Sequence, residues 1–180
     1  MKYAVLLFCF LLCGCASTDP DQPHLLFREN AGDFEMVAAK TKVVPDPHAG
    51  WIEIKGPGIV SSLSPRRLYS LKIRMDFRKD RKSDLFQLQV HADFPRRVFL
   101  TEAYADGRKL KMKVLDRERV CEQDCVTVER IGIVLSEAEL ADYATRGFAF
   151  EILGRRDEVV LQVPAAYLAA VRHVYLRERE

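Results

Sequence analysis

The 180-residue sequence lacks most of the motifs that reveal an enzyme or a nucleic-acid-binding protein. It has no glycine-rich phosphate loop, dinucleotide-binding motif, calcium-binding loop or G-x-S-x-G nucleophile motif. The formal net charge is only +2, so no strong basic field favours nucleic acid as a partner. The sequence therefore excludes the common motif-defined classes, and we expect no cofactor.

Long hydrophobic runs are also scarce. The longest one covers residues 3–12. This run follows Lys2 and is about half the length of roughly 20 apolar residues that a membrane-spanning helix needs. A short positive start followed by such a run is typical of a secretory signal. We therefore predict a removable signal peptide over residues 1–14 and export of the rest of the chain.

The end of this run carries a more specific pattern. Leu12-Cys13-Gly14-Cys15 resembles the lipobox of bacterial lipoproteins, in which the cysteine is acylated and becomes the first residue of the mature protein. The resemblance covers this segment only and implies lipidation of Cys15 and a membrane as partner. An Asp directly after the lipidated cysteine would favour retention at the inner membrane, but Ala16 and Ser17 follow Cys15. We therefore expect the protein to be anchored to the periplasmic face of the outer membrane. An ordinary signal peptide with incidental cysteines is the alternative.

Removal of the signal changes how the five cysteines are interpreted. Cys9 and Cys13 leave with the signal and Cys15 carries lipid, so only Cys121 and Cys125 remain. In an oxidising compartment such a pair predicts a disulfide, here at the neck of a hairpin.

Metal or redox work is the competing interpretation of this pair. The C-x-x-x-C spacing is similar to that of thioredoxin-fold copper-delivery proteins, but the strand-like pattern continues after Cys125. No histidine stands at a local zinc-like spacing from the pair, and no metal site is predicted. The histidines are His24, His48, His91 and His173.

The rest of the chain predicts a flexible tether over residues 15–24 and one domain over residues 25–180. Residues 30–40 fit either a short helix or a first strand. Apolar and polar residues then alternate with the period of two that is typical of half-buried strands. The expected strands cover residues 51–55, 69–77, 86–92, 98–105, 109–115, 126–135, 148–153 and 158–163, with a hairpin turn at Asp106-Gly107.

Two helices are expected among the later strands. Leu135, Ser136, Glu139 and Leu140 occupy the positions of a hydrophobic staple and a capping box, which predicts a helix ending at Gly147. Pro164 suits the start of a closing helix. The fold class that follows is mainly β, an antiparallel sandwich or barrel-like domain with two short helices near the C-terminus.

Two sets of basic residues are candidates for binding an anion. Lys109, Lys111 and Lys113 would lie on one face of a strand, although lysines also protect edge strands from further pairing. Arginine pairs stand at three predicted turns and would form a basic rim if the turns met at one end of a sandwich. The pairs are Arg66-Arg67, Arg96-Arg97 and Arg155-Arg156.

Three functions remain open on this sequence. The first is a non-enzymatic, lipid-anchored module that binds or scaffolds another envelope protein or an anionic envelope component. The second is an envelope-acting enzyme of unidentified class, although no catalytic residue is predicted and Ser61, Ser62 and Ser64 have no nucleophile motif around them. The third is metal or redox handling through Cys121 and Cys125.

Overall fold

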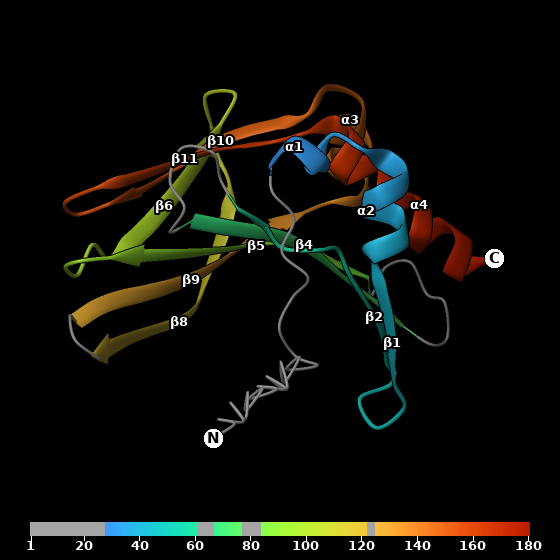
Figure 1. The fold of residues 1–180 in the computed structure, drawn as a ribbon, viewed down its shortest axis with the longest axis horizontal. Coiled ribbons are helices and arrows are strands. Elements are labelled where there is room, and N and C mark those ends of the chain that lie inside the picture. The colour runs from blue at the N-terminus through green and yellow to red at the C-terminus, as the bar shows by residue number, and fades with distance from the viewer. Residues whose placement is uncertain (1–27, 61–66, 77–83, 122–124) are drawn as a thin grey trace, which may run out of the picture.

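Two antiparallel β-sheets and a group of helices make up the computed structural model (Figure 1). It describes residues 28–60, 67–76, 84–121 and 125–180. The expected signal peptide, Cys15, the tether and Ser61, Ser62 and Ser64 lie outside the described residues. The predicted mainly-β, antiparallel class is confirmed, and the sheets do not close into a barrel.

The larger sheet, sheet A, follows the strand order β1-β2-β4-β5-β9-β8, with β3 paired to β4. The smaller, sheet B, follows the order β11-β10-β6-β7. The strands of sheet A are β1 (Lys42–Asp46), β2 (Trp51–Lys55), β3 (Ile59–Val60), β4 (Arg67–Asp76), β5 (Leu85–Phe94), β8 (Lys111–Cys121) and β9 (Cys125–Leu135). Those of sheet B are β6 (Leu100–Ala105), β7 (Arg108–Lys109), β10 (Phe148–Gly154) and β11 (Glu158–Val163).

The centre of sheet A is the hairpin that the alternating pattern predicts. Tyr69 pairs with Val90, Leu71 with Leu88 and Ile73 with Phe86, so the apolar residues of β4 and β5 share one face. All six are buried, and they belong to one continuous core. The polar residues between them lie on the opposite face, here called the outer face of sheet A.

Sheet B covers only part of sheet A. At the left of Figure 1, β6, β10 and β11 lie as one layer above β8 and β9, which is the arrangement of a sandwich. At the right, β1, β2 and β4 extend past sheet B, and helices cover their apolar face instead. The helices are α1 (Arg28–Ala31), α2 (Phe34–Lys40), α3 (Glu137–Arg146) and α4 (Ala165–Arg179).

The alternative left open for residues 30–40 is settled in favour of a helix. Asp33 caps α2 by accepting a hydrogen bond from the backbone N–H of Met36. Thr41 ends the helix, and β1 begins at Lys42 as an edge strand of sheet A. An edge position explains why Pro45 is tolerated within β1, since proline cannot donate a hydrogen bond to a neighbouring strand.

Both C-terminal helices form as the sequence predicts. The Ser136–Glu139 capping box is present in full at the start of α3, and Gly147 ends the helix with a φ of 82°. α4 follows Pro164 and buries Leu168, Val171 and Tyr175. No helix within the described part of the chain is both long and apolar enough to cross a membrane.

α4 lies so close to sheet A that one position in the contact is restricted to glycine. A Cβ atom at Gly56 would lie 2.6 Å from the Tyr167 hydroxyl oxygen and 2.7 Å from a Val171 methyl carbon. The Tyr167 hydroxyl accepts a hydrogen bond from the backbone N–H of Leu71 and donates one to the carbonyl of Pro57, each 2.9 Å long. The helix is thus bonded both to β4 and to the chain just after β2.

Two expected strands differ from the structure. The strand predicted over residues 98–105 begins only at Leu100, because Phe99 has a φ of 57° that no strand accommodates. The strand predicted over residues 109–115 is divided at Leu110, so Lys109 ends β7 in sheet B and Lys111 begins β8 in sheet A. The Asp106-Gly107 hairpin turn is confirmed, with positive φ at both residues.

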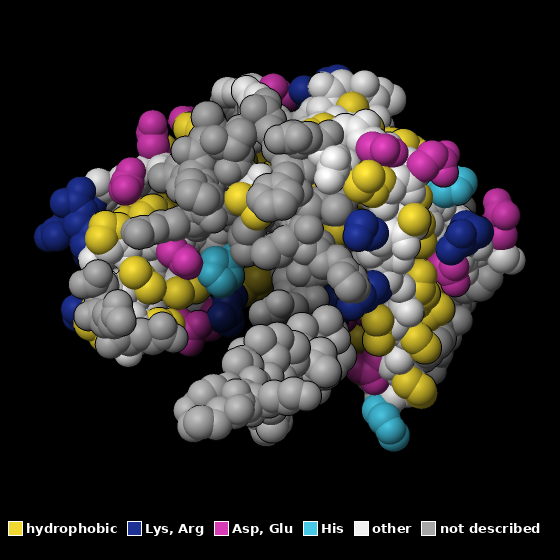
Figure 2. Space-filling model, in the orientation of Figure 1, with side chains coloured by type: hydrophobic (Ala, Val, Ile, Leu, Met, Phe, Trp, Pro, Cys, Tyr) yellow, Lys and Arg dark blue, Asp and Glu magenta, His cyan; other side chains and the backbone are white. Residues whose placement is uncertain are grey.

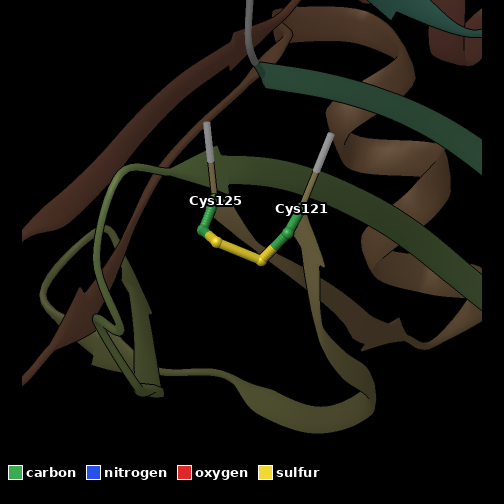
Figure 3. The surroundings of a disulfide bond; sticks show 2 residues. All are labelled: Cys121 and Cys125. Atoms are coloured by element: carbon green, nitrogen blue, oxygen red, sulfur yellow. A yellow bond between two sulfur atoms is a disulfide. The ribbon is translucent and has the colours of Figure 1, made fainter. Parts of the chain in front are cut away.

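The predicted disulfide joins the last residue of β8 to the first residue of β9 (Figure 3). Cys121 and Cys125 are direct partners in the strand pairing, and their Cα atoms are 4.1 Å apart. The bond therefore connects the neck of a hairpin, whose residues 122–124 lie outside the described residues.

Replacing Cys121 and Cys125 together by serine should lower the free energy of unfolding by about 2 kcal/mol, since a bond that closes so short a loop constrains the unfolded chain only modestly. Urea unfolding of the oxidised protein and the double variant measures this difference. The reduced protein serves as the control and should match the variant. A loss below about 0.5 kcal/mol would show that the unfolded chain is not constrained by the bond.

Candidate functional site

Two of the predicted basic turns meet at one end of the sandwich. The backbone N–H of Arg155, in the β10–β11 turn, donates a hydrogen bond of 2.9 Å to the carbonyl of Val98, in the loop after Arg96-Arg97. Figure 2 shows Lys and Arg side chains gathered at this end, over the β10–β11 turn of Figure 1. Of the third pair, Arg66 lies outside the described residues and Arg67 begins β4.

A buried carboxylate organises this end. Glu129 of β9 is fully buried, and its side chain accepts hydrogen bonds from the backbone N–H groups of Phe99 (2.6 Å) and Leu100 (2.9 Å). It also accepts from Arg117 Nε at 3.0 Å, and Arg117 donates in turn to the carbonyl of Leu100. Charge-assisted bonds of this kind join β9 and β8 of sheet A to the start of β6 in sheet B.

Phe99 has a strained backbone that these bonds stabilise. Its φ of 57° is unfavourable for a bulky residue, and the two hydrogen bonds to Glu129 fix the peptide on each side of the turn. The ring is thereby placed 5.6 Å from the guanidinium carbon of Arg117 and 5.3 Å from that of Arg155. Phe99 thus holds Arg117 of β8 and Arg155 of the β10–β11 turn beside each other through cation–π contacts.

The resulting site, here called the arginine end, contains a hollow of about 240 Å³. Among the described residues, Arg97 and Arg119 have no ion-pair partner within 4.0 Å, whereas Arg117 is paired with Glu129. The site therefore presents positive charge with little compensation. The hollow is lined by Arg97, Phe99, Arg117, Glu118, Arg119, Thr127 and Glu129.

A β-bulge brings Arg117 and Arg119 to this site. The pairing of β8 with β9 shifts between Val114 and Asp116, and one extra residue in a strand reverses which face the following side chains occupy. Arg117 and Arg119 therefore share the inner face with their partners Glu129 and Thr127. Sequence reasoning missed both arginines and Glu129, although an acidic residue inside the apolar run of residues 126–135 is a signal that would have drawn attention to it.

The three lysines expected on one strand face are separated in the structure. Lys109 lies in sheet B and forms an ion pair with Glu102, whose carboxylate also accepts a bond from Tyr104. Lys111 and Lys113 lie on the outer face of β8, which is an edge strand. Their placement agrees with protection of that edge.

The remaining candidates do not gather into a catalytic or metal site in the part of the chain that is described. His91 lies on the outer face of β5, 3.0 Å from a carboxylate oxygen of Asp93. Cys121 and Cys125 are joined to each other. Within residues 28–60, 67–76, 84–121 and 125–180, no three His, Cys, Asp or Glu side chains are grouped as a metal site requires.

Glu129→Gln should lower the free energy of unfolding by about 3 kcal/mol, the lower end of the range for breaking a buried pair, because Arg117 is partly exposed to water. Both carboxylate oxygens of Glu129 accept hydrogen bonds, so the NH₂ group of the glutamine would face an N–H donor with which it cannot bond. Glu118→Gln is the matched control on the exposed side of β8 and should cost less than 1 kcal/mol. Equal losses in urea unfolding would show that Glu129 has no special role.

The chain matches no family model, no curated protein and no solved structure.

Proposed function

We propose that this chain is an exported, lipid-anchored envelope protein whose β domain is a non-enzymatic binding module. Its arginine end binds the carboxylate or phosphate groups of an anionic envelope component or partner protein. Cys15 carries the lipid, and the domain stands on the periplasmic face of the outer membrane behind the tether of residues 15–24.

The observation that carries the binding role is the convergence at the arginine end. Arg97 and Arg119 line a hollow of about 240 Å³ beside Arg117, and none of the acidic residues described there pairs with the first two. A guanidinium presents its N–H donors in a planar fork that matches a carboxylate or a phosphate. Placing several such groups together costs electrostatic energy, which a bound anion would offset.

The two alternatives have weaker support. Enzymatic function would need a nucleophile or an acid–base pair beside the hollow, and Glu129 is occupied by three donors. Metal binding would need free thiolates, whereas Cys121 and Cys125 form a disulfide, and this disulfide joins directly paired positions of a hairpin, as a structural bond does. Binding is therefore the function that the described residues support best.

The lipid anchor is tested by Cys15→Ser. We expect the wild-type chain, expressed in a Gram-negative host, to fractionate with outer membranes and to incorporate labelled palmitate, because two or more acyl chains hold a protein stably on a bilayer. The variant should lose the label and leave the membrane fraction. Cys13→Ser is the matched control and should keep both properties. Membrane retention of the Cys15→Ser variant without label would disprove the anchor.

The arginine end is tested by Arg97→Gln together with Arg119→Gln, with citrate as the probe in titration calorimetry. Loss of two charged donors should weaken binding by about tenfold or more, since a hydrogen bond to a charged group contributes roughly 1.5–3 kcal/mol. Lys111→Gln together with Lys113→Gln removes the same two positive charges from the outer face of β8 and should leave the affinity unchanged. Equal weakening in both proteins, or none in either, would reject this site.

A further inference from the structure

A second basic site lies on the outer face of sheet A, formed by residues far apart in the sequence. In the strand pairing Lys42 of β1 lies opposite Lys55 of β2, and Lys55 lies opposite Lys72 of β4. Directly paired residues point to the same face, with Cβ atoms about 4.5–5.5 Å apart. These three residues, here called the lysine row, therefore place three ammonium groups beside one another.

The lysine row lines a pocket of about 400 Å³, within the size range of small-molecule sites. Lys40, from the last turn of α2, adds a fourth ammonium group, and Ser70 and Gln89 contribute neutral polar groups from the next row of the sheet. Figure 2 shows Lys and Arg side chains near the place where α2 meets β1 in Figure 1. The pocket thus combines a strongly basic side with a hydroxyl and an amide.

One carboxylate compensates part of this charge. Glu53 lies 2.9 Å from Lys55 Nζ and 2.5 Å from Lys72 Nζ, and its side chain is only 13% exposed. Burial raises the pKa of Glu53, but the hydrogen bonds and charges of Lys55 and Lys72 together outweigh it and hold the pKa below its usual value. Glu53 is therefore ionised at neutral pH. Among the described acidic residues, none lies within 4.0 Å of Lys40 or Lys42, so positive charge remains in excess.

Edge protection does not explain the lysine row. Lysine on an edge strand prevents further pairing, which accounts for Lys42 on β1. Lys55 and Lys72 lie on β2 and β4, which are already paired on both sides, and Lys72 is only 20% exposed. Like charges directly opposite each other destabilise a sheet, so this arrangement costs free energy when no anion is present.

We propose that this pocket binds a phosphomonoester carried on a small polar group, either a free phosphorylated metabolite or the headgroup of a lipid. The ammonium groups of Lys42, Lys55 and Lys72 pair with the phosphate oxygens, as lysine does when it acts as a compact point charge. A dianion matches the excess of positive charge better than a single carboxylate does. Ser70 and Gln89 hydrogen-bond the hydroxyl groups of the carrier.

Glycerol 3-phosphate is the soluble probe and phosphatidylcholine vesicles with or without phosphatidic acid are the membrane probe, with the chain lacking residues 1–14 and carrying Cys15→Ser. Lys42→Gln together with Lys72→Gln should weaken binding about tenfold or more and leaves Glu53 paired with Lys55 and Arg74. Glu53→Gln should tighten binding, because it removes the competing carboxylate. Opposite effects of the two variants distinguish a binding site from a merely structural charge network.

Lys111→Gln together with Lys113→Gln is the matched control, with the same loss of charge on the same face at the opposite edge of sheet A. This control should leave the affinity for both probes unchanged. The Arg97 and Arg119 variant should also leave it unchanged, so the test of this inference is independent of the test of the proposed function. Binding to glycerol 3-phosphate alone indicates a free metabolite, and binding to phosphatidic acid vesicles alone indicates a headgroup. No binding of either probe, or equal weakening by the Lys111 and Lys113 control, would overturn the inference.

Discussion

The buried carboxylate of Glu129 is the interaction on which the two-sheet arrangement depends. Sheet B begins where Phe99 and Leu100 donate their backbone N–H groups to this side chain, and Arg117 completes its hydrogen bonds from β8. A buried charge is costly unless it is paired in this way, so the strained turn at Phe99, the position of Arg117 and the start of β6 are coupled. The same bonds place Arg117 in the hollow that Arg97 and Arg119 also line, so that stability and the proposed binding site share one cause.

The unequal size of the sheets gives the molecule two separate basic surfaces. Sheet B closes the apolar face over β8 and β9, while helices take that role over β1, β2 and β4. The arginine end lies at the open end of the sandwich, and the lysine row lies on the outer face of the strands beyond it. Four strand steps separate β2 from β8, which corresponds to roughly 19 Å across the sheet. Two anions would therefore bind independently.

Local patterns predicted the elements of this fold well. Alternation identified the β4–β5 hairpin, the Ser136 capping box identified α3, and the interpretation of the five cysteines identified the disulfide. The sites depend on information that is not local. The bulge after Val114 moves Arg117 and Arg119 to a different face from Lys111 and Lys113, although all four stand at alternate positions in the sequence. The lysine row depends on which strands become neighbours, and spacing along the chain does not determine that.

The hydroxyl of Tyr167 bears on the order in which the chain can fold. Its two hydrogen bonds, to Leu71 of β4 and to Pro57 just after β2, span 96 and 110 residues and pair two backbone groups in a buried part of the structure. α4 also packs against α2, so helices from near the two ends of the described chain lie together. The contacts that hold α4 against sheet A can therefore form only after the C-terminal residues have been synthesised. Contacts of such long range slow folding, because segments that are distant in the sequence must meet before these contacts can form.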